Sequence, residues 1–216
     1  MFRKIYLVGL LFFAMGLVSG QGVKFGIKFD PTITWLRSDV KEVMPYRAYL
    51  GFDLGMTVDN YFSKNYAFAT GISLFNTGGT LKYLKAIELF TKDGKIKIEP
   101  GDNVKYKVQY VKVPIAMKFK THMIGRFVYS ANLGFDPMIR ISGRADFYNE
   151  KSANVNDEIK FLNAGWHFGG GAHYSLGGEV ALFFGLSYMS AFMDMTKPAF
   201  DMITSNNLFY RIGIIF

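Results

Sequence analysis

The sequence predicts an all-β fold: an eight-stranded antiparallel up-and-down transmembrane β-barrel, preceded by a cleaved N-terminal signal peptide. Three observations predict it. Apolar side chains alternate with polar or small ones in eight segments, the links between segments alternate in length, and aromatic residues gather at both ends of the expected strands. With 216 residues, 50% of them hydrophobic and 19% charged, the chain is suited to an ordered domain rather than to disorder.

Residues 1–20 have the pattern of a secretory signal peptide. Arg3 and Lys4 give a basic start, an uncharged apolar run extends from Ile5 to Val18, and small residues follow. The apolar run is shorter than the roughly 20 residues that a spanning helix needs. We therefore expect cleavage before Gln21, which leaves residues 21–216 as the mature barrel domain.

The eight segments of period two cover residues 23–35, 50–58, 66–74, 111–119, 127–141, 162–174, 180–188 and 208–216. Their apolar faces begin, in chain order, with Val23, Leu50, Tyr66, Val111, Phe127, Leu162, Val180 and Leu208. The opposite faces are polar or small, and the sixth is rich in glycine. Alternation alone does not say which face points inward, so other features have to decide.

Three features favour a membrane barrel with its apolar face outward. The less apolar face combines Lys, Arg and Asp with Gly and Ala, which suits a narrow, side-chain-filled interior. Short links around residues 59–65, 120–126 and 175–178 alternate with longer ones, as expected for periplasmic turns and external loops with both termini in the periplasm. That topology also makes two aromatic girdles, with Tyr66, Phe127, Tyr129, Tyr174 and Phe216 at the periplasmic rim and Trp35, Trp166 and Tyr188 at the outer rim.

Pro114 is a local exception within the fourth strand. A closed barrel has no free edge at which a residue without an N–H is easily tolerated. We expect either a bulge or a missing ladder bond there.

The expected lumen carries charges in a narrow space. Such charges must pair or keep water, since an unpaired buried charge costs several kcal/mol. Because an eight-stranded interior is nearly filled by side chains, we interpret the lumen as a structural plug, with a narrow anion pore as the alternative. The predicted luminal polar network comprises Lys24, Lys28, Asp30, Asp53, Lys112, Lys118, Asp136, Arg140, His167 and Arg211.

The chain resembles the PorT-like outer-membrane β-barrel proteins of Gram-negative bacteria. The resemblance covers the mature chain and rests on the opening strand from Val23 to Lys28, the proline strand from Tyr110 to Phe119, the Gly-rich sixth strand and the ending from Arg211 to Phe216. It implies an integral outer-membrane barrel, and for some members a link to the assembly or operation of a secretion apparatus. The alternating ending Tyr210, Ile212, Ile214 and Phe216 resembles the signal that the barrel-assembly machinery recognises in its clients.

The link between the third and fourth strands predicts an external hairpin over about residues 78–103. Asp93 and Gly94, between alternating strands, form a strong signal for a two-residue turn. That turn makes paired positions sum to 187, which places Phe68 opposite Phe119, Ile72 opposite Ile115 and Leu74 opposite Val113. The arm would expose an apolar strip unless neighbouring loops or a partner cover it. Its candidate partner-binding residues are Ile87, Leu89, Phe90, Asp93, Gly94, Ile96 and Ile98.

Composition limits the function classes. With no cysteine there is no thiolate metal site, cysteine nucleophile or lipidated cysteine. The net charge of +8 falls to +6 once Arg3 and Lys4 are removed, which is too mild to indicate nucleic-acid binding. His167 and His173 would point into the lumen on one strand, and a polar network suits them better than catalysis. We predict no metal and no cofactor.

The leading hypothesis is a non-enzymatic outer-membrane barrel whose external loops contact a partner, in a secretion, uptake or assembly complex. The alternatives are a barrel enzyme acting on lipid or peptide at the outer rim, and a surface adhesin or ligand binder. Outer-membrane lipid and lipopolysaccharide are expected partners of any such barrel, and the barrel-assembly machinery is an expected partner during biogenesis.

Overall fold

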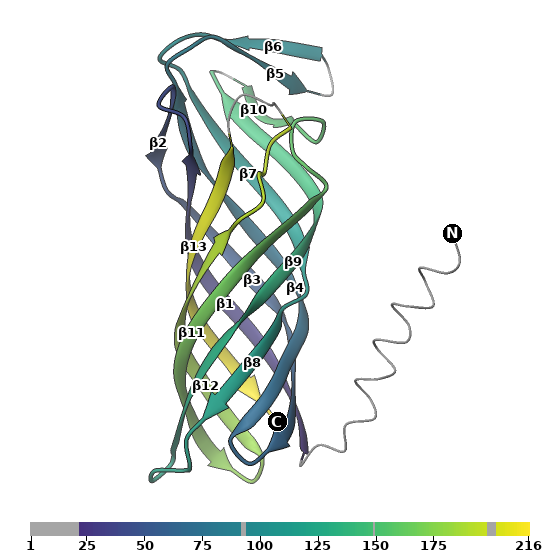
Figure 1. Cartoon of the computed structure of the whole chain (residues 1–216), viewed down its shortest axis with the longest axis vertical. Helices are drawn as coiled ribbons and strands as arrows, with labels where there is room; N and C mark the ends of the chain where they lie inside the picture. The colour runs from purple at the N-terminus through teal and green to yellow at the C-terminus, as the bar shows by residue number, and fades with distance from the viewer. Residues whose placement is uncertain (1–21, 92–93, 149, 198–201) are drawn as a thin grey trace, which may run out of the picture.

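The computed structural model describes residues 22–91, 94–148, 150–197 and 202–216, which fold as an antiparallel β-barrel (Figure 1). No helix within those ranges is long and apolar enough to cross a membrane. The segment 1–20, expected to be a signal peptide, lies outside the described residues. The strands are β1 (Gly22–Ser38), β2 (Val43–Arg47), β3 (Tyr49–Ser63), β4 (Tyr66–Tyr83), β5 (Ile87–Thr91), β6 (Gly94–Ile98), β7 (Asn103–Lys112), β8 (Ile115–Lys120), β9 (Phe127–Phe147), β10 (Glu150–Asn154), β11 (Leu162–Gly177), β12 (Val180–Ala191) and β13 (Ile203–Ile215).

Eight strand positions close the ring. β1 pairs with β3 on one side and with β13 on the other, and the ring continues through β4, β9, β11 and β12. β7 and β8 share the remaining position, because both pair with β4 and with β9. β2 and β10 are short additional strands on β4 and β9. The predicted eight-stranded antiparallel barrel is confirmed.

The two ends of the barrel differ. β1 begins and β13 ends at one end, where short turns join β3 to β4, β8 to β9 and β11 to β12 (Figure 1). At this basal end, Phe25 and Phe216 exchange two backbone hydrogen bonds of 2.8 Å. The hairpin β5–β6 lies across the opposite end, which we call the capped end. The predicted alternation of short and long links is therefore present.

Aromatic side chains meet near both ends of the outward-facing apolar band. Towards the capped end, the Tyr188 ring centroid lies 6.3 Å from that of Trp35 and 5.8 Å from that of Trp166. Towards the basal end, the Phe127 and Tyr174 ring centroids are 5.1 Å apart. Both predicted girdles are thus formed, and they mark the limits of the band that faces lipid.

The proline strand is interrupted without a change of register. β7 ends at Lys112 and β8 begins at Ile115, so Val113 and Pro114 belong to neither strand. The pairing with β4 and β9 keeps one register on both sides of this gap. Val113 still donates its N–H to the carbonyl oxygen of Pro137 at 3.1 Å. The ladder gap expected at Pro114 is confirmed, and the alternative of a bulge at that residue is not.

Beyond the apolar band the barrel wall continues, and the polarity of its faces inverts. On the upper part of β7, the alternate residues Val104, Tyr106, Val108 and Tyr110 are buried inside the barrel, with at most 1% of their surface exposed. The intervening residues are polar and face outward. The barrel therefore has a polar lumen at membrane level and an apolar interior towards the capped end.

The external hairpin is shorter than predicted. Leu81 pairs with Val104 and Lys82 with Asn103, so the ends of β4 and β7 are part of the barrel wall. Of the hairpin expected over residues 78–103, β5 and β6 alone form a separate two-stranded sheet within the described chain. The sequence analysis assigned all of residues 78–103 to an arm above the barrel. The structure instead places the start of β7 in the barrel wall, because its apolar residues, such as Val104 and Tyr106, are buried inside the barrel.

The register of the hairpin also differs from the predicted one, by two residues. Thr91 is the last residue of β5 and pairs with Gly94, the first residue of β6, whose φ is +130°. The same offset continues along the wall, where Phe68 lies opposite Met117. A shift of two residues leaves every side chain on its predicted face. Three predicted pairs are nevertheless wrong: Phe68 with Phe119, Ile72 with Ile115, and Leu74 with Val113.

Candidate functional site

Four charged residues form the centre of a luminal network at membrane level. Asp53 Oδ2 accepts hydrogen bonds from Lys28 Nζ and, at 2.6 Å, from Lys112 Nζ. Lys28 Nζ also donates to Asp30 Oδ2 at 2.9 Å. β1, β3 and β7 supply these side chains, and each is nearly fully buried. Because little solvent reaches them, the charges must compensate one another.

A histidine–carboxylate hydrogen bond and a further ion pair flank this centre. His167 Nδ1 lies 2.9 Å from Asp136 Oδ2, and Lys118 Nζ donates to Asp59 Oδ2 at 2.5 Å. Asp59 was not among the predicted luminal residues, because the sequence placed it in the link after the second segment. Asp59 lies six residues after Asp53 and therefore on the same, inward face of the strand. This alternation could have identified it as luminal.

The remaining predicted luminal residues differ in their surroundings. Arg211 Nε lies 3.6 Å from Asp30 Oδ2, and Lys24 lines a cavity of about 110 Å³ at the basal mouth. Arg140 does not join the network, which corrects its predicted placement. It lies opposite Tyr110, nearer the capped end, and its Nη1 donates to Asn156 Oδ1. A register shift in β9 beside Arg140 separates it from the strand positions that carry the network.

Aromatic rings also reach into the lumen. Lys112 Nζ lies 4.8 Å from the centroid of Phe75 and 4.5 Å from that of Phe209, and the Arg211 guanidinium lies 5.1 Å from that of Phe183. Contacts of this kind stabilise a cation that is withdrawn from water. The sequence interpretation missed these three rings, although each occupies the inward phase of its strand.

A small polar cavity remains inside the network. Its volume is about 70 Å³, and Asp53 and Asp136 are among the residues that line it. One carboxylate oxygen of each has no hydrogen-bond partner among the described residues. A polar cavity of this size can accommodate ordered water, which satisfies such oxygens.

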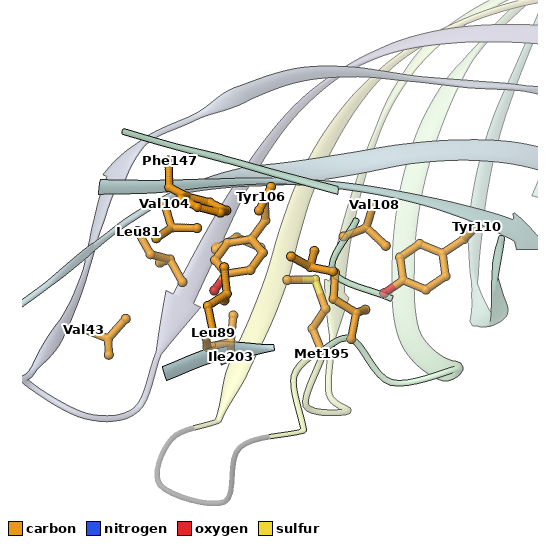
Figure 2. Packing of buried hydrophobic residues seen from close by; sticks show 14 of the residues in the cluster. Val43, Leu81, Leu89, Val104, Tyr106, Val108, Tyr110, Phe147, Met195 and Ile203 are labelled. Atoms are coloured by element: carbon orange, nitrogen blue, oxygen red, sulfur yellow. The ribbon is translucent and has the colours of Figure 1, made fainter. Parts of the chain in front are cut away.

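An apolar plug fills the barrel between this network and the capped end (Figure 2). Phe75 and Phe209, whose rings contact Lys112, form its inner limit. Tyr83 and Tyr106 share a hydrogen bond of 2.8 Å between their hydroxyls. The plug comprises Leu36, Val43, Phe75, Leu81, Tyr83, Leu89, Ile98, Val104, Tyr106, Val108, Tyr110, Met138, Ala145, Phe147, Val155, Ile159, Met189, Met195, Ile203 and Phe209.

One close approach shows how tightly the plug is packed. A Cβ at Gly79 would lie 2.9 Å from both the Cγ and the backbone N of Leu36. Next to it, the Thr34 hydroxyl donates to the Gly78 carbonyl at 2.6 Å, so β1 and β4 touch directly here. Glycine at position 79 permits this contact, which narrows the barrel at the plug.

The hairpin β5–β6 closes the plug from above, and we call it the cap. Leu89 and Ile98 are fully buried members of the plug, while Ile87 and Ile96 are partly buried against it. The apolar strip expected on this arm is therefore covered by the barrel's own residues. The predicted arm residue Asp93 and the side chain of Phe90 lie outside what the structure describes.

A hydrogen-bonded clasp joins the cap to the neighbouring hairpin. The Tyr148 hydroxyl, from the turn between β9 and β10, donates to Asp102 Oδ2 and accepts from the Glu99 N–H at 3.1 Å. The carboxylate of Asp102, by accepting this bond, raises the pKa of Tyr148 above its ordinary value. Asp102 and Glu99 belong to the link between β6 and β7, so the clasp holds the base of the cap.

The luminal histidines form two separate pairs. His173 Nε2 lies 2.8 Å from Ser130 Oγ, and His167 pairs with Asp136. The six-residue spacing of the two histidines on β11 separates them by about 20 Å. No group of three or more His, Asp or Glu side chains in the described ranges could hold a metal ion. Ser130 and His173 are thus joined by one hydrogen bond inside the lumen.

Comparisons with known proteins agree with this architecture. The family model for an outer membrane protein beta-barrel domain matches residues 18–197. OprG from Pseudomonas aeruginosa aligns with a TM-score of 0.52 at 13% identity, over 91% of this chain and 97% of that chain. Neisserial surface protein A aligns with a TM-score of 0.48 at 13% identity, over 90% and 98% of the two chains. At these identities the likeness concerns the fold alone. No curated protein sequence matches.

Proposed function

Because this chain belongs to the outer membrane protein beta-barrel domain family, and is thus an outer-membrane protein of a Gram-negative bacterium, we propose that it is a non-enzymatic barrel that contacts a partner protein through its capped end. The main support for this proposal is the plug. Because side chains fill the lumen from Phe75 to the cap, a partner approaching from that side can contact only the outer surface of the capped end. Conduction through the barrel would need a path that the plug fills, and a substrate from the capped end would have to pass the plug to reach the lumen.

The cap has features that suit a protein contact. Its outward face is charged, with Lys95 Nζ 2.8 Å from Glu88 Oε2 and Lys97 Nζ 3.0 Å from Glu99 Oε1. These charges discourage self-association, while the outer edges of the two strands pair with no other strand in the described chain. An exposed strand edge with alternating charges can accept a strand from a partner.

We further propose that the capped end lies outside the cell and that both termini lie in the periplasm. The short turns at the basal end and the longer links at the capped end support this orientation. The proline strand from Tyr110 to Phe119 supports membership of the PorT-like branch, and with it a place in a secretion or assembly complex. The barrel-assembly machinery would recognise the last strand through Tyr210, Ile212, Ile214 and Phe216, whose side chains are exposed on the lipid-facing side.

The proposal is tested by reversing charges on the cap. Lys95→Glu together with Lys97→Glu should reduce, by about tenfold, the partners cross-linked to the protein in native membranes, since a tenfold change needs only about 1.4 kcal/mol. Both side chains are well exposed, at 59% and 66%, so the barrel itself should fold normally. Quantitative mass spectrometry of the cross-linked material measures the change.

The matched control is Lys64→Glu together with Lys197→Glu, which makes the same charge change at two exposed positions that do not belong to the cap. The control should retain the partners of the unmodified protein. Equal recovery of every partner by the cap variant and by the control would contradict a contact through the cap.

A further inference from the structure

The outward side chains of β4, β7 and β9 change from apolar to polar at the same level along the barrel axis. Leu74 pairs with Val111 and Val111 with Ile139. These three paired residues form one apolar row across the strands, and we call such a row of paired residues a rung. Towards the capped end, Asn76 pairs with Gln109, and the outward face becomes polar. This rung marks the edge of the lipid-facing band on that side of the barrel.

Basic residues occupy the next outward positions. Lys107 lies opposite Arg144, and Lys105 is one outward position further towards the capped end. Thr80 pairs with both Lys105 and Arg47, which brings β2 to the same face. We call the group formed by Arg47, Lys82, Lys105, Lys107 and Arg144 the basic face.

The height of the basic face follows from the strand geometry. Lys107 lies four residues from Val111, which corresponds to about 13 Å along the strand and about 10 Å along the barrel axis at a tilt near 40°. A side chain at that height above the apolar band lies at the level of lipid headgroups. Lysine and arginine side chains can also extend downward from there towards phosphate groups.

The charge of this face is largely uncompensated. Asp146 is the one carboxylate on these rungs within the described chain, and it is bound by Lys107 Nζ at 2.5 Å and by the Ser152 N–H at 2.8 Å. Lys105 Nζ lies 5.4 Å from the ring centroid of Tyr49. This contact positions the ammonium group but does not neutralise its charge. Five cations thus face one carboxylate.

The opposite wall has a different composition at the same level. Arg37 on β1 pairs with Thr204 on β13, and Phe192 follows the end of β12. Lys160 Nζ near this wall is bound to Asp194 Oδ2 at 2.6 Å. The five cations of the basic face therefore lie on the side formed by β2, β4, β7 and β9.

We propose that the basic face binds the phosphate groups of the phosphorylated glycolipid in the leaflet surrounding the capped end. This inference rests on the proposed orientation, in which that leaflet is the outer one and its glycolipid is lipopolysaccharide. Several Lys and Arg side chains at headgroup level provide charge-assisted hydrogen bonds to phosphate oxygens, and the adjoining apolar rung contacts the acyl chains. The lipid is held at one side of the barrel.

The experiment uses purified mature protein in mild detergent with diphosphorylated lipid A as the probe. Native mass spectrometry measures the fraction of protein that retains lipid A, and enzymatically dephosphorylated lipid A is the comparison ligand. Lys105→Gln, Lys107→Gln and Arg144→Gln in one chain should weaken binding of the phosphorylated probe by at least about tenfold. The same variant should bind the dephosphorylated probe as the unmodified protein does.

A control with Arg37→Gln, Lys41→Gln and Lys197→Gln removes the same charge from exposed positions elsewhere at the capped end. It should retain binding, and slower migration of boiled than of unboiled samples on SDS gels verifies that both variants are folded. Equal weakening in the two variants, preference for a soluble polyanion such as polyglutamate over lipid A, or failure of the unmodified protein to bind lipid A would overturn the proposal. No partner protein is present in this assay, so its result is independent of the test of the cap.

Discussion

Replacing Asp53 with Asn should lower the free energy of unfolding by about 3–5 kcal/mol, the usual range when one partner of a buried ion pair is removed. Asp53 is fully buried and accepts hydrogen bonds from both Lys28 and Lys112. The neutral amide would leave Lys112 without its carboxylate partner, and Lys28 with Asp30 alone, where solvent barely reaches. Urea unfolding from lipid vesicles, followed by the fluorescence of Trp35 and Trp166, measures the loss.

A second substitution tests whether the lost stability comes from an unpaired cation. Lys112→Met in the Asp53→Asn background removes the cation that has lost its carboxylate partner, so the double variant should be more stable than the sum of the single effects predicts. Asp157→Asn, at an exposed position, is the control and should change stability little. If Asp53→Asn unfolds at the same urea concentration as Asp157→Asn, the network does not support the barrel in the way described.

Substituting Asp for Leu89 should release the cap while the barrel stays folded. Leu89 is fully buried in the plug, and an unpaired carboxylate there costs several kcal/mol. The cap is a two-stranded sheet without other strand partners in the described chain, so detaching it costs less than keeping the charge buried. Cleavage by proteinase K within residues 84–101 should become faster, on the order of tenfold or more, as expected for a locally opened segment.

Lys97→Asp is the matched control, because it places the same side chain on the exposed face of the same hairpin. Cleavage of this control should remain close to that of the unmodified protein. A cap that stays equally resistant in the Leu89→Asp variant would show that the buried strip does not hold it to the barrel.

The period of two in the sequence determined the fold class and the facing of each strand, but not the register. The outward sets of β4 and β8 agree with the predicted pairing of Phe68 with Phe119 and equally with the observed pairing of Phe68 with Met117. Both registers keep the same faces in contact, because they differ by two residues. Alternation therefore cannot distinguish them, and the structure does so through the pairing of Thr91 with Gly94 and of Phe68 with Met117.

The sequence analysis predicted a lumen filled by polar side chains, but not the apolar part of the plug, which was within reach of the sequence. Val104, Tyr106, Val108 and Tyr110 continue the inward phase of Lys112, so their alternation already placed apolar side chains inside the barrel. Interpreting every apolar face as lipid-facing concealed this, since alternation does not reveal where the membrane ends. The burial of Leu89 and Ile98 could not be inferred, because it depends on how the cap folds onto residues distant in the chain.

The most direct test of the closed barrel is the electrical conductance of the purified mature protein in planar lipid bilayers. The plug and the ion pairs around a cavity of only about 70 Å³ predict no stepwise currents above those of a protein-free membrane. The variant in which a short Gly-Ser turn replaces residues 84–101 should also remain closed, because the plug residues of the barrel wall stay in place. Regular current steps of constant size from the unmodified protein would contradict a plugged lumen.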